Sequence, residues 1–182
     1  METTSRKGSF FRVADPSWDD PLDGSFAQRF GGRWNPENSF PVIYLNADME
    51  TARANARRML TVQLQGYPYA AEDVIEDELP VLVSAFVPEG SYLDVVNNDA
   101  IVANGLPLTY PLDGGSTIVP WSVCQPIGVS AHNASLSGVA CRSAAALAPA
   151  DGEELAWFAE SDVKLTFLET QRFEAWYGEF DW

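Results

Sequence analysis

An arginine that follows a pair of glycines is the most distinctive chemical feature of this sequence. The segment Arg29–Leu45 reads RFGGRWNPENSFPVIYL, so that Arg33 stands between two glycines and Trp34. Glycines allow a tight turn or a close approach of the backbone to a ligand, and a guanidinium can form two parallel hydrogen bonds with a phosphate group. The pattern therefore indicates an anion-binding turn, with Trp34 as a flat stacking surface. A surface turn whose arginine forms a salt bridge is the simpler alternative.

Two more polar side chains stand within apolar segments. Arg12 follows two phenylalanines, and its side chain must reach solvent, a carboxylate or a bound anion, because a lone buried charge is costly. Tyr44 lies near the end of the apolar segment Pro41–Leu45. By itself it is an ordinary strand aromatic, and it becomes a candidate ligand contact only together with Arg33.

Length and composition restrict the class of protein. A chain of 182 residues with 46% hydrophobic and 20% charged residues is expected to form one globular domain. Its net charge of −15 argues against duplex nucleic acid or a membrane as the main partner. Two cysteines and the single His132 form neither a disulfide framework nor a zinc site. No signal peptide or membrane span is recognisable, so a cytoplasmic location is expected.

The elements expected to position these residues are short strands and one helix. The helix is predicted over 49–64, with Asn46 as its N-cap, because apolar residues recur there at helical spacing. Residues 1–9 are expected to be loose, 15–32 to form a long loop, and 97–129 to be broken by glycine and proline. Strands are expected at 10–13, 42–45, 80–87, 92–96, 137–146, 155–159 and 163–168. This order predicts a single α+β domain over 10–182, with a mixed or antiparallel sheet and few helices.

Together, these segments resemble the RES domain family, whose members are toxins of RES–Xre toxin–antitoxin pairs. The resemblance rests on the strand with Arg12, on GGRWNP at 31–36, on PVIYL at 41–45, on ETARAN at 50–55 and on SGVACRSAA at 137–145. It implies an ADP-ribosyltransferase-like fold with NAD⁺ as the substrate and no prosthetic group or metal. It also implies an Xre-type antitoxin as a partner and no direct contact with nucleic acid, and it leaves a homodimer open.

The resemblance also assigns roles to individual residues. Arg33, Tyr44 and Ser143 match the family's arginine, tyrosine and serine, and Arg12 matches an early arginine of the same pocket. These residues suit the cleavage of the bond between nicotinamide and ribose, because arginines hold a pyrophosphate and an aromatic ring stacks on a base. ADP-ribose would then pass to phosphate, to water or to a protein.

One position departs from the family pattern. The family glutamate on the helix falls at Asn55, and an amide carries no charge and cannot act as a base. Another carboxylate, such as Asp48 or one near Glu76, could reach the site instead. Two alternatives to an active enzyme follow, namely an NAD-binding module without efficient turnover and a structural or partner-binding protein.

Overall fold

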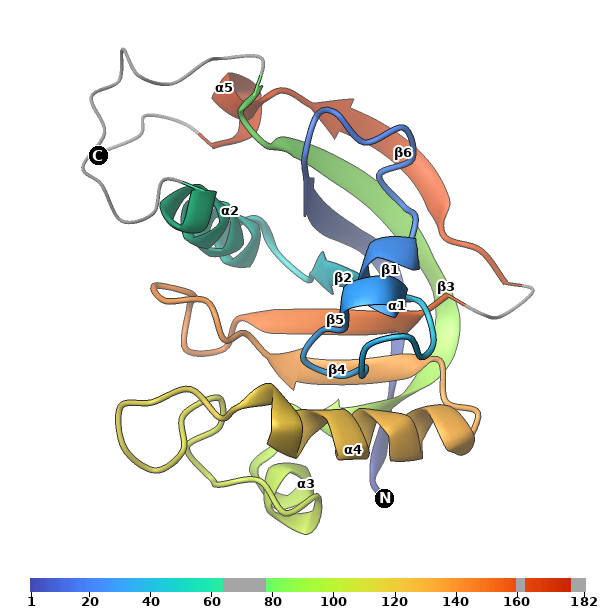
Figure 1. Ribbon diagram of the computed structural model, residues 1–182, viewed down its shortest axis with the longest axis vertical. Coiled ribbons are helices and arrows are strands. Elements are labelled where there is room, and N and C mark those ends of the chain that lie inside the picture. Colours follow the sequence, from blue (N-terminus) through green and yellow to red (C-terminus); the bar gives the residue numbers. More distant parts are fainter. Residues whose placement is uncertain (64–77, 160–162, 178–182) are drawn as a thin grey trace.

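The computed structural model describes residues 1–63, 78–159 and 163–177, and it confirms the α+β class. Within these residues, six strands form one mixed sheet in the order β1-β2-β5-β4-β3-β6, in which only the β3–β4 pair is parallel (Figure 1). The strands are β1 (Thr3–Ala14), β2 (Val42–Asn46), β3 (Val81–Val95), β4 (Gly138–Arg142), β5 (Glu153–Phe158) and β6 (Thr166–Gln171). The helices are α1 (Ser25–Phe30), α2 (Met49–Gln63), α3 (Asn98–Ala103), α4 (Trp121–Asn133) and α5 (Phe173–Trp176).

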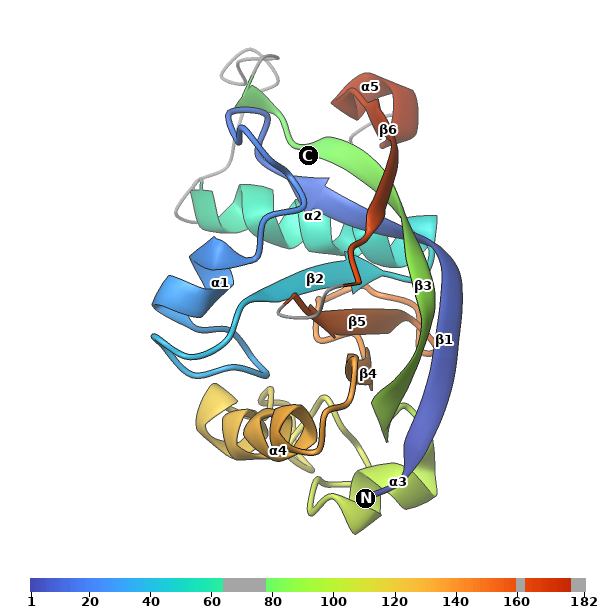
Figure 2. The same ribbon diagram turned by 90° about the vertical axis from the view of Figure 1, so that its right-hand side faces the viewer.

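The longest strands bend the sheet back on itself. β1 pairs with β2 and also with β3, so β1, β2, β5, β4 and β3 form a closed circuit. The β1–β2 contact in this circuit is narrow, with Phe11 opposite Asn46, whereas β1 and β3 run side by side along most of their length (Figure 2). β2 ends at Asn46 and α2 begins at Met49, and several polar side chains are hydrogen-bonded to one another at this junction.

The N-terminal segment is a strand rather than a loose end. Thr3 pairs with Leu93 and the pairing continues to Ala14, because the long β3 offers a complete edge of backbone groups. β3 itself runs through the stretch 88–91, where the sequence suggested a break between two strands. Both strands are therefore longer than the sequence predicted. Their additional residues, 3–9 in β1 and 88–91 in β3, are mostly polar and partly exposed, so they show no apolar pattern.

Helices α1, α3 and α4 were not predicted, and α3 and α4 both begin in the segment 97–129 that was expected to be broken by glycine and proline. α1 lies inside the segment 15–32, which the sequence predicted as a loop. α4 runs through Pro126 and Gly128, which had read as breaks in the chain. Gly128 is needed for packing, because a Cβ there would lie 1.8 Å from the carbonyl oxygen of Trp34. α4 thus supports the segment that carries Arg33.

α2 is the helix that the sequence predicted, but its N-terminus is capped differently. The Asp48 carboxylate accepts hydrogen bonds from the backbone N–H of Thr51 at 2.7 Å and from its hydroxyl at 2.8 Å. Asn46, the expected cap, is the last residue of β2 and donates its amide to the carbonyl of Phe11 at 3.1 Å. Asn46 is thereby held in the sheet, with its amide oxygen directed to α2.

The sheet is covered on both faces, and the candidate site lies on the face covered by α4. That face packs Val42, Val139, Ala156 and Phe158 against helix and loop residues that include Trp34, Tyr110 and Cys124. The other face packs Phe10, Ile43, Leu155 and Trp157. A third group of buried residues joins α2 to α5 and β3, namely Ala52, Ala56, Leu60, Leu82, Phe173 and Trp176.

Candidate active site

The turn before Arg33 is built by close backbone packing. Gly31 has φ +75°, which favours glycine, and the N–H of Gly32 donates to the carbonyl of Asn35 at 2.9 Å. A Cβ on Gly32 would lie 2.4 Å from the hydroxyl oxygen of Tyr44. Glycine at position 32 therefore lets the β2 tyrosine reach under the turn.

Asn35 holds this turn in place, a role that the sequence did not reveal. Its side chain is fully buried and its amide donates to the carbonyl of Ala27 at 2.6 Å. Its Oδ1 accepts the hydroxyl of Tyr44 at 3.0 Å, and that hydroxyl accepts the N–H of Trp34, also at 3.0 Å. The one available signal was the Asn-Pro pair, which predicts a turn but no buried network.

The turn directs the side chain of Arg33 into the protein. Arg33 is 9% exposed, and its Nη1 donates to the carbonyl of Val119 at 2.9 Å and lies 3.9 Å from the sulfur of Cys124. No ion pair joins it to a carboxylate in the part of the chain that the structure describes. A buried cation without a paired anion is costly, so Arg33 is suited to hold an anionic group of a ligand.

Trp34 packs the core instead of presenting a stacking surface. It is 0% exposed, its indole N–H points to the sulfur of Cys141 at 3.3 Å, and its ring lies 6.1 Å from that of Tyr110. Arg33 and Asn35, the polar residues on either side, are buried as well, so the whole turn packs against the body of the protein. Its contribution to a site is therefore to fix the Arg33 turn.

Tyr44 is held as a neutral phenol. Burial is the main cause that raises its pKa, and the negative field of Glu154 acts in the same direction. The hydrogen bond from the N–H of Trp34 and the charge of Arg33 lower it by less. Tyr44 thus keeps its proton at neutral pH and holds the turn through Asn35.

A second polar group joins α2 to β4 and β5. Oε1 of Glu154 accepts the hydroxyl of Ser143 at 2.5 Å and the amide of Asn55 at 2.9 Å. The same Asn55 amide donates to Oδ1 of Asn46 at 2.7 Å. The structure thus brings the predicted Asn55 and Ser143 to one carboxylate oxygen. Glu154 was not among the predicted residues.

The register of the sheet places both groups on one face. Tyr44 pairs with Ala156 and Asn46 with Glu154, so the two β2 side chains lie on the same face two residues apart. Cys141, which contacts Trp34, is opposite Glu154 on β4, and Ser143 is the second residue after it. The Arg33 turn and the Asn55–Ser143–Glu154 group are therefore neighbours along the ends of β2, β5 and β4.

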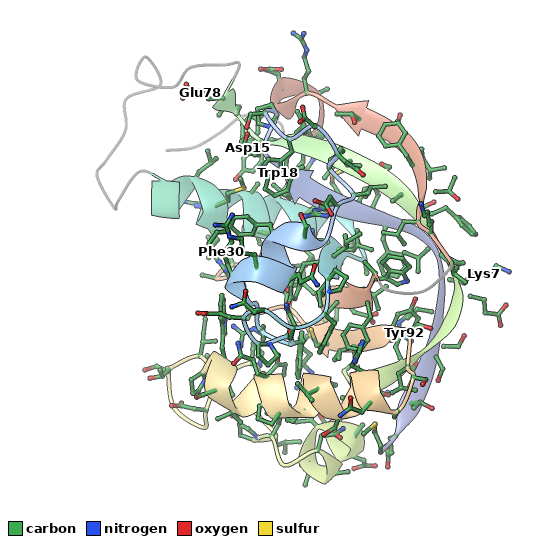
Figure 3. All side chains as sticks on the ribbon, turned by 45° about the vertical axis from the view of Figure 1, so that its right-hand side comes forward. Lys7, Asp15, Trp18, Phe30, Glu78 and Tyr92 are labelled. Carbon is green, nitrogen blue, oxygen red and sulfur yellow. The ribbon has the colours of Figure 1, made fainter. Side chains whose placement is uncertain are left out.

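Arg12 occupies a different place. It is 8% exposed, its guanidinium donates to the carbonyl of Asp23 at 3.2 Å, and it lies 5.1 Å from the centre of the Trp18 ring. Trp18 is on the loop after β1, near Asp15 (Figure 3). Burial lowers the pKa of Arg12 to about 10, so it stays charged at neutral pH. None of its hydrogen bonds to described residues reaches Arg33, Tyr44 or Ser143.

Neither of the other carboxylates named from the sequence is seen in this site. Asp48 is used as the helix cap and is bonded to Thr51. Glu76 lies outside the described residues. Within those residues, no cluster of three or more His, Cys, Asp or Glu side chains is arranged to hold a metal. No helix in the described part of the chain is both long and apolar enough to cross a membrane.

These features define a class of α+β domain. Its mixed sheet closes back on itself, it buries an arginine that forms no ion pair with a described residue, and a serine is hydrogen-bonded to a carboxylate. The sequence model of the RES domain matches residues 9–174, and the chain therefore belongs to the RES domain family.

Named relatives agree with this family. The NAD(+) phosphorylases MbcT of Mycobacterium tuberculosis and Mycobacterium bovis are each 32% identical to this chain over 123 residues. The match covers 66% of this chain and 59% of the relatives, so the chain matches about three fifths of their length. A chain of the crystal structure of the M. tuberculosis MbcT–MbcA toxin–antitoxin complex superposes with a TM-score of 0.75 at 24% identity. That superposition covers 97% of this chain and 92% of the other, and it shows a shared fold.

Proposed function

We propose that this protein is a RES-type toxin that binds NAD⁺ and cleaves its nicotinamide–ribose bond, with phosphate as the acceptor of ADP-ribose. The observation that carries the proposal is Arg33, a buried guanidinium that donates only to a neutral carbonyl and a thiol among the described residues. A dinucleotide pyrophosphate is an anion that a guanidinium binds through two parallel hydrogen bonds. The choice of phosphate as acceptor is supported by the relatives, which are named NAD(+) phosphorylases.

The neighbouring polar group suits the other half of the substrate. Cleavage builds positive charge on the ribose ring, as in glycoside hydrolysis, and a nearby carboxylate stabilises that charge. Ser143 and Asn55 supply hydroxyl and amide groups that can bond ribose hydroxyls. In this arrangement Arg33 and Tyr44 would bind NAD⁺, and Trp34 would fix the turn. Arg12, which lies beside the loop 15–24, would supply a second positive charge for the substrate.

Partners follow from the same proposal. An enzyme that removes NAD⁺ from its own cell requires a neutralising protein, and the matched crystal structure is of a toxin–antitoxin complex. We therefore propose an antitoxin partner, of the Xre type that the family resemblance implies, and a cytoplasmic location. Whether the chain forms a homodimer stays a prediction to be tested by its mass in solution.

The test is NAD⁺ loss with purified protein, in buffers with and without phosphate. Rapid loss that depends on phosphate, with release of nicotinamide and ADP-ribose 1-phosphate, is expected. Loss without phosphate would replace phosphorolysis by hydrolysis. If calorimetry detects NAD⁺ binding but no NAD⁺ is consumed, the result would instead favour an NAD-binding module without turnover. The observation that favours this alternative is the uncharged amide of Asn55 at the position of the family glutamate. Neither binding nor loss would overturn the proposal.

A further inference from the structure

The carboxylate of this site lies on a strand instead of on helix α2. We propose that Glu154 of β5 is the catalytic carboxylate, and that Ser143 and Asn55 position it; this inference rests on the proposed NAD⁺ cleavage. Asn55 stands where the family pattern expects a glutamate, and the Asn55 amide donates to Oε1 of Glu154 at 2.9 Å. A single hydrogen bond thus separates the expected carboxylate position from the one observed.

The environment of Glu154 differs from that of the preceding acid. Glu153 points to the opposite face of β5, where its two oxygens accept Nε and Nη2 of Arg6 at 2.5 and 2.8 Å. Glu154 forms no ion pair with any described residue. Its charge therefore acts on the site face, where it contributes to raising the pKa values of the Tyr44 and Tyr110 phenols.

Only one oxygen of Glu154 is bonded to described residues. Oε1 accepts both Ser143 and Asn55, and no described residue donates to Oε2. Two donors on one oxygen fix the rotation of the carboxylate without neutralising its charge. Oε2 then remains available to face the ribose or the incoming acceptor, which is what a carboxylate that stabilises the transition state requires.

Cleavage breaks one bond and forms one bond at the same ribose carbon. The bond between the ribose carbon and the nicotinamide nitrogen breaks, and its electron pair leaves with nicotinamide, which becomes neutral. Negative charge on Glu154 stabilises the developing ribose cation. An oxygen of hydrogenphosphate forms the new bond to the same carbon, and its proton passes to Glu154 and then to water. No oxidant, metal or further reactant is needed.

An amide at position 55 also fits this arrangement better than an acid. Glutamate there would place two carboxylates within hydrogen-bonding distance, and like charges so close force one group to stay protonated. The Asn55 amide instead donates a hydrogen bond to the carboxylate. Glu154 therefore carries the negative charge of this pair, and Asn55 stabilises that charge by donating a hydrogen bond.

The experiment compares five proteins: wild type, Glu154→Gln, Glu154→Asp, the exchange Asn55→Glu with Glu154→Asn, and the control Glu153→Gln. Single-turnover NAD⁺ cleavage and NAD⁺ affinity are measured separately, and folding is checked by circular dichroism. Glu154→Gln should lose about 10²–10⁴ in rate with little change in affinity. Glu154→Asp and the exchange should each recover part of that loss, because each restores a carboxylate. Glu153→Gln should cleave at the wild-type rate.

The outcomes separate the two proposals. An active wild type with an equally active Glu154→Gln would overturn the role of Glu154 and leave NAD⁺ cleavage intact. A folded Glu154→Gln that no longer binds NAD⁺ would also overturn it, because binding and not chemistry would then be lost. A wild type that neither binds nor cleaves NAD⁺ would overturn the proposed function itself.

Discussion

The hydroxyl of Ser143 donates a hydrogen bond to the carboxylate of Glu154 at 2.5 Å, although the two residues are eleven positions apart. They stand at the ends of adjacent antiparallel strands, and the loop 143–152 between them lies beside α2 (Figure 1). The backbone N–H of Ser143 also donates to the carbonyl of Gly152 at 2.8 Å. The loop is thus closed at its base, and this closure holds the serine and the acid together.

The first prediction concerns Ser143→Ala. Loss of the hydroxyl removes one of the two donors on Oε1 of Glu154, and a hydrogen bond to a charged group contributes about 1.5–3 kcal/mol. If that bond orients the carboxylate in the transition state, kcat for NAD⁺ cleavage should fall about ten- to a hundredfold while KM changes little. Steady-state kinetics with varied NAD⁺ measures both values.

Ser130→Ala is the matched control for that variant. Ser130 is an exposed residue of α4 whose hydroxyl bonds the carbonyl of Pro126, so its loss should leave kcat unchanged. A Ser143→Ala protein that keeps the wild-type kcat would show that the serine only closes the loop.

The second prediction concerns Arg33. Arg33→Ala should weaken NAD⁺ binding by about 1.5–3 kcal/mol, because a charge-assisted contact with the pyrophosphate is lost. Arg33→Lys should recover only part of the affinity, since an ammonium cannot form the paired bonds of a guanidinium. Calorimetry with NAD⁺ checks both variants. Arg29→Lys, at an exposed position on α1, serves as the control, and equal affinity in all four proteins would contradict the assignment.

Local patterns in the sequence predicted part of this site. The apolar run at 42–45 and the helical spacing after it correctly predicted β2 and α2. These two elements position Tyr44 and Asn55, but both residues were named as candidates from the resemblance to the RES family and not from the local pattern. The Gly-Gly-Arg turn was visible because a pair of glycines allows a tight turn of the backbone. Burial of Trp34 was not visible, since it depends on α4 and its Gly128.

Glu154 could not be found in the same way. The sequence shows two adjacent acids at the start of a strand, and alternation dictates that they face opposite sides. Which one faces the site depends on the register of β5 with β2 and β4, and on Arg6, which lies 147 positions from Glu153. Such long-range pairing leaves no local signal. α4 was missed for a related reason, because Pro126 and Gly128 read as breaks while packing against Trp34 favours the helix.

The third prediction concerns the two cysteines. Cys124 and Cys141 are buried free thiols, and burial is the main cause that raises the pKa of each. The charge of Arg33 lowers the pKa of Cys124 by less than burial raises it. A raised pKa leaves less of the reactive thiolate at a given pH. Iodoacetamide at pH 8 should therefore label neither cysteine in the native protein and both in guanidinium chloride. Mass spectrometry counts the labels, and rapid native labelling of Cys124 would show that Arg33 controls its ionisation.

The last prediction concerns Gly32→Ala, which tests whether the Arg33 turn depends on the approach of Tyr44. A Cβ at position 32 would lie 2.4 Å from the Tyr44 hydroxyl oxygen and 2.9 Å from Oδ1 of Asn35.

Neither neighbour of that Cβ can move freely, because Tyr44 is fixed in β2 and Asn35 is fully buried. Overpacking of this kind costs about 1–3 kcal/mol, so the free energy of unfolding in urea should fall by that amount. Displacement of the turn should also move Arg33 and weaken NAD⁺ binding. Gly115→Ala is the control, because a Cβ there would meet only the exposed Asp113 carboxylate, at 3.3 Å, and should change neither quantity. A Gly32→Ala protein as stable as the control variant would mean that the turn shifts without cost, and that Tyr44 does not hold Arg33 in position.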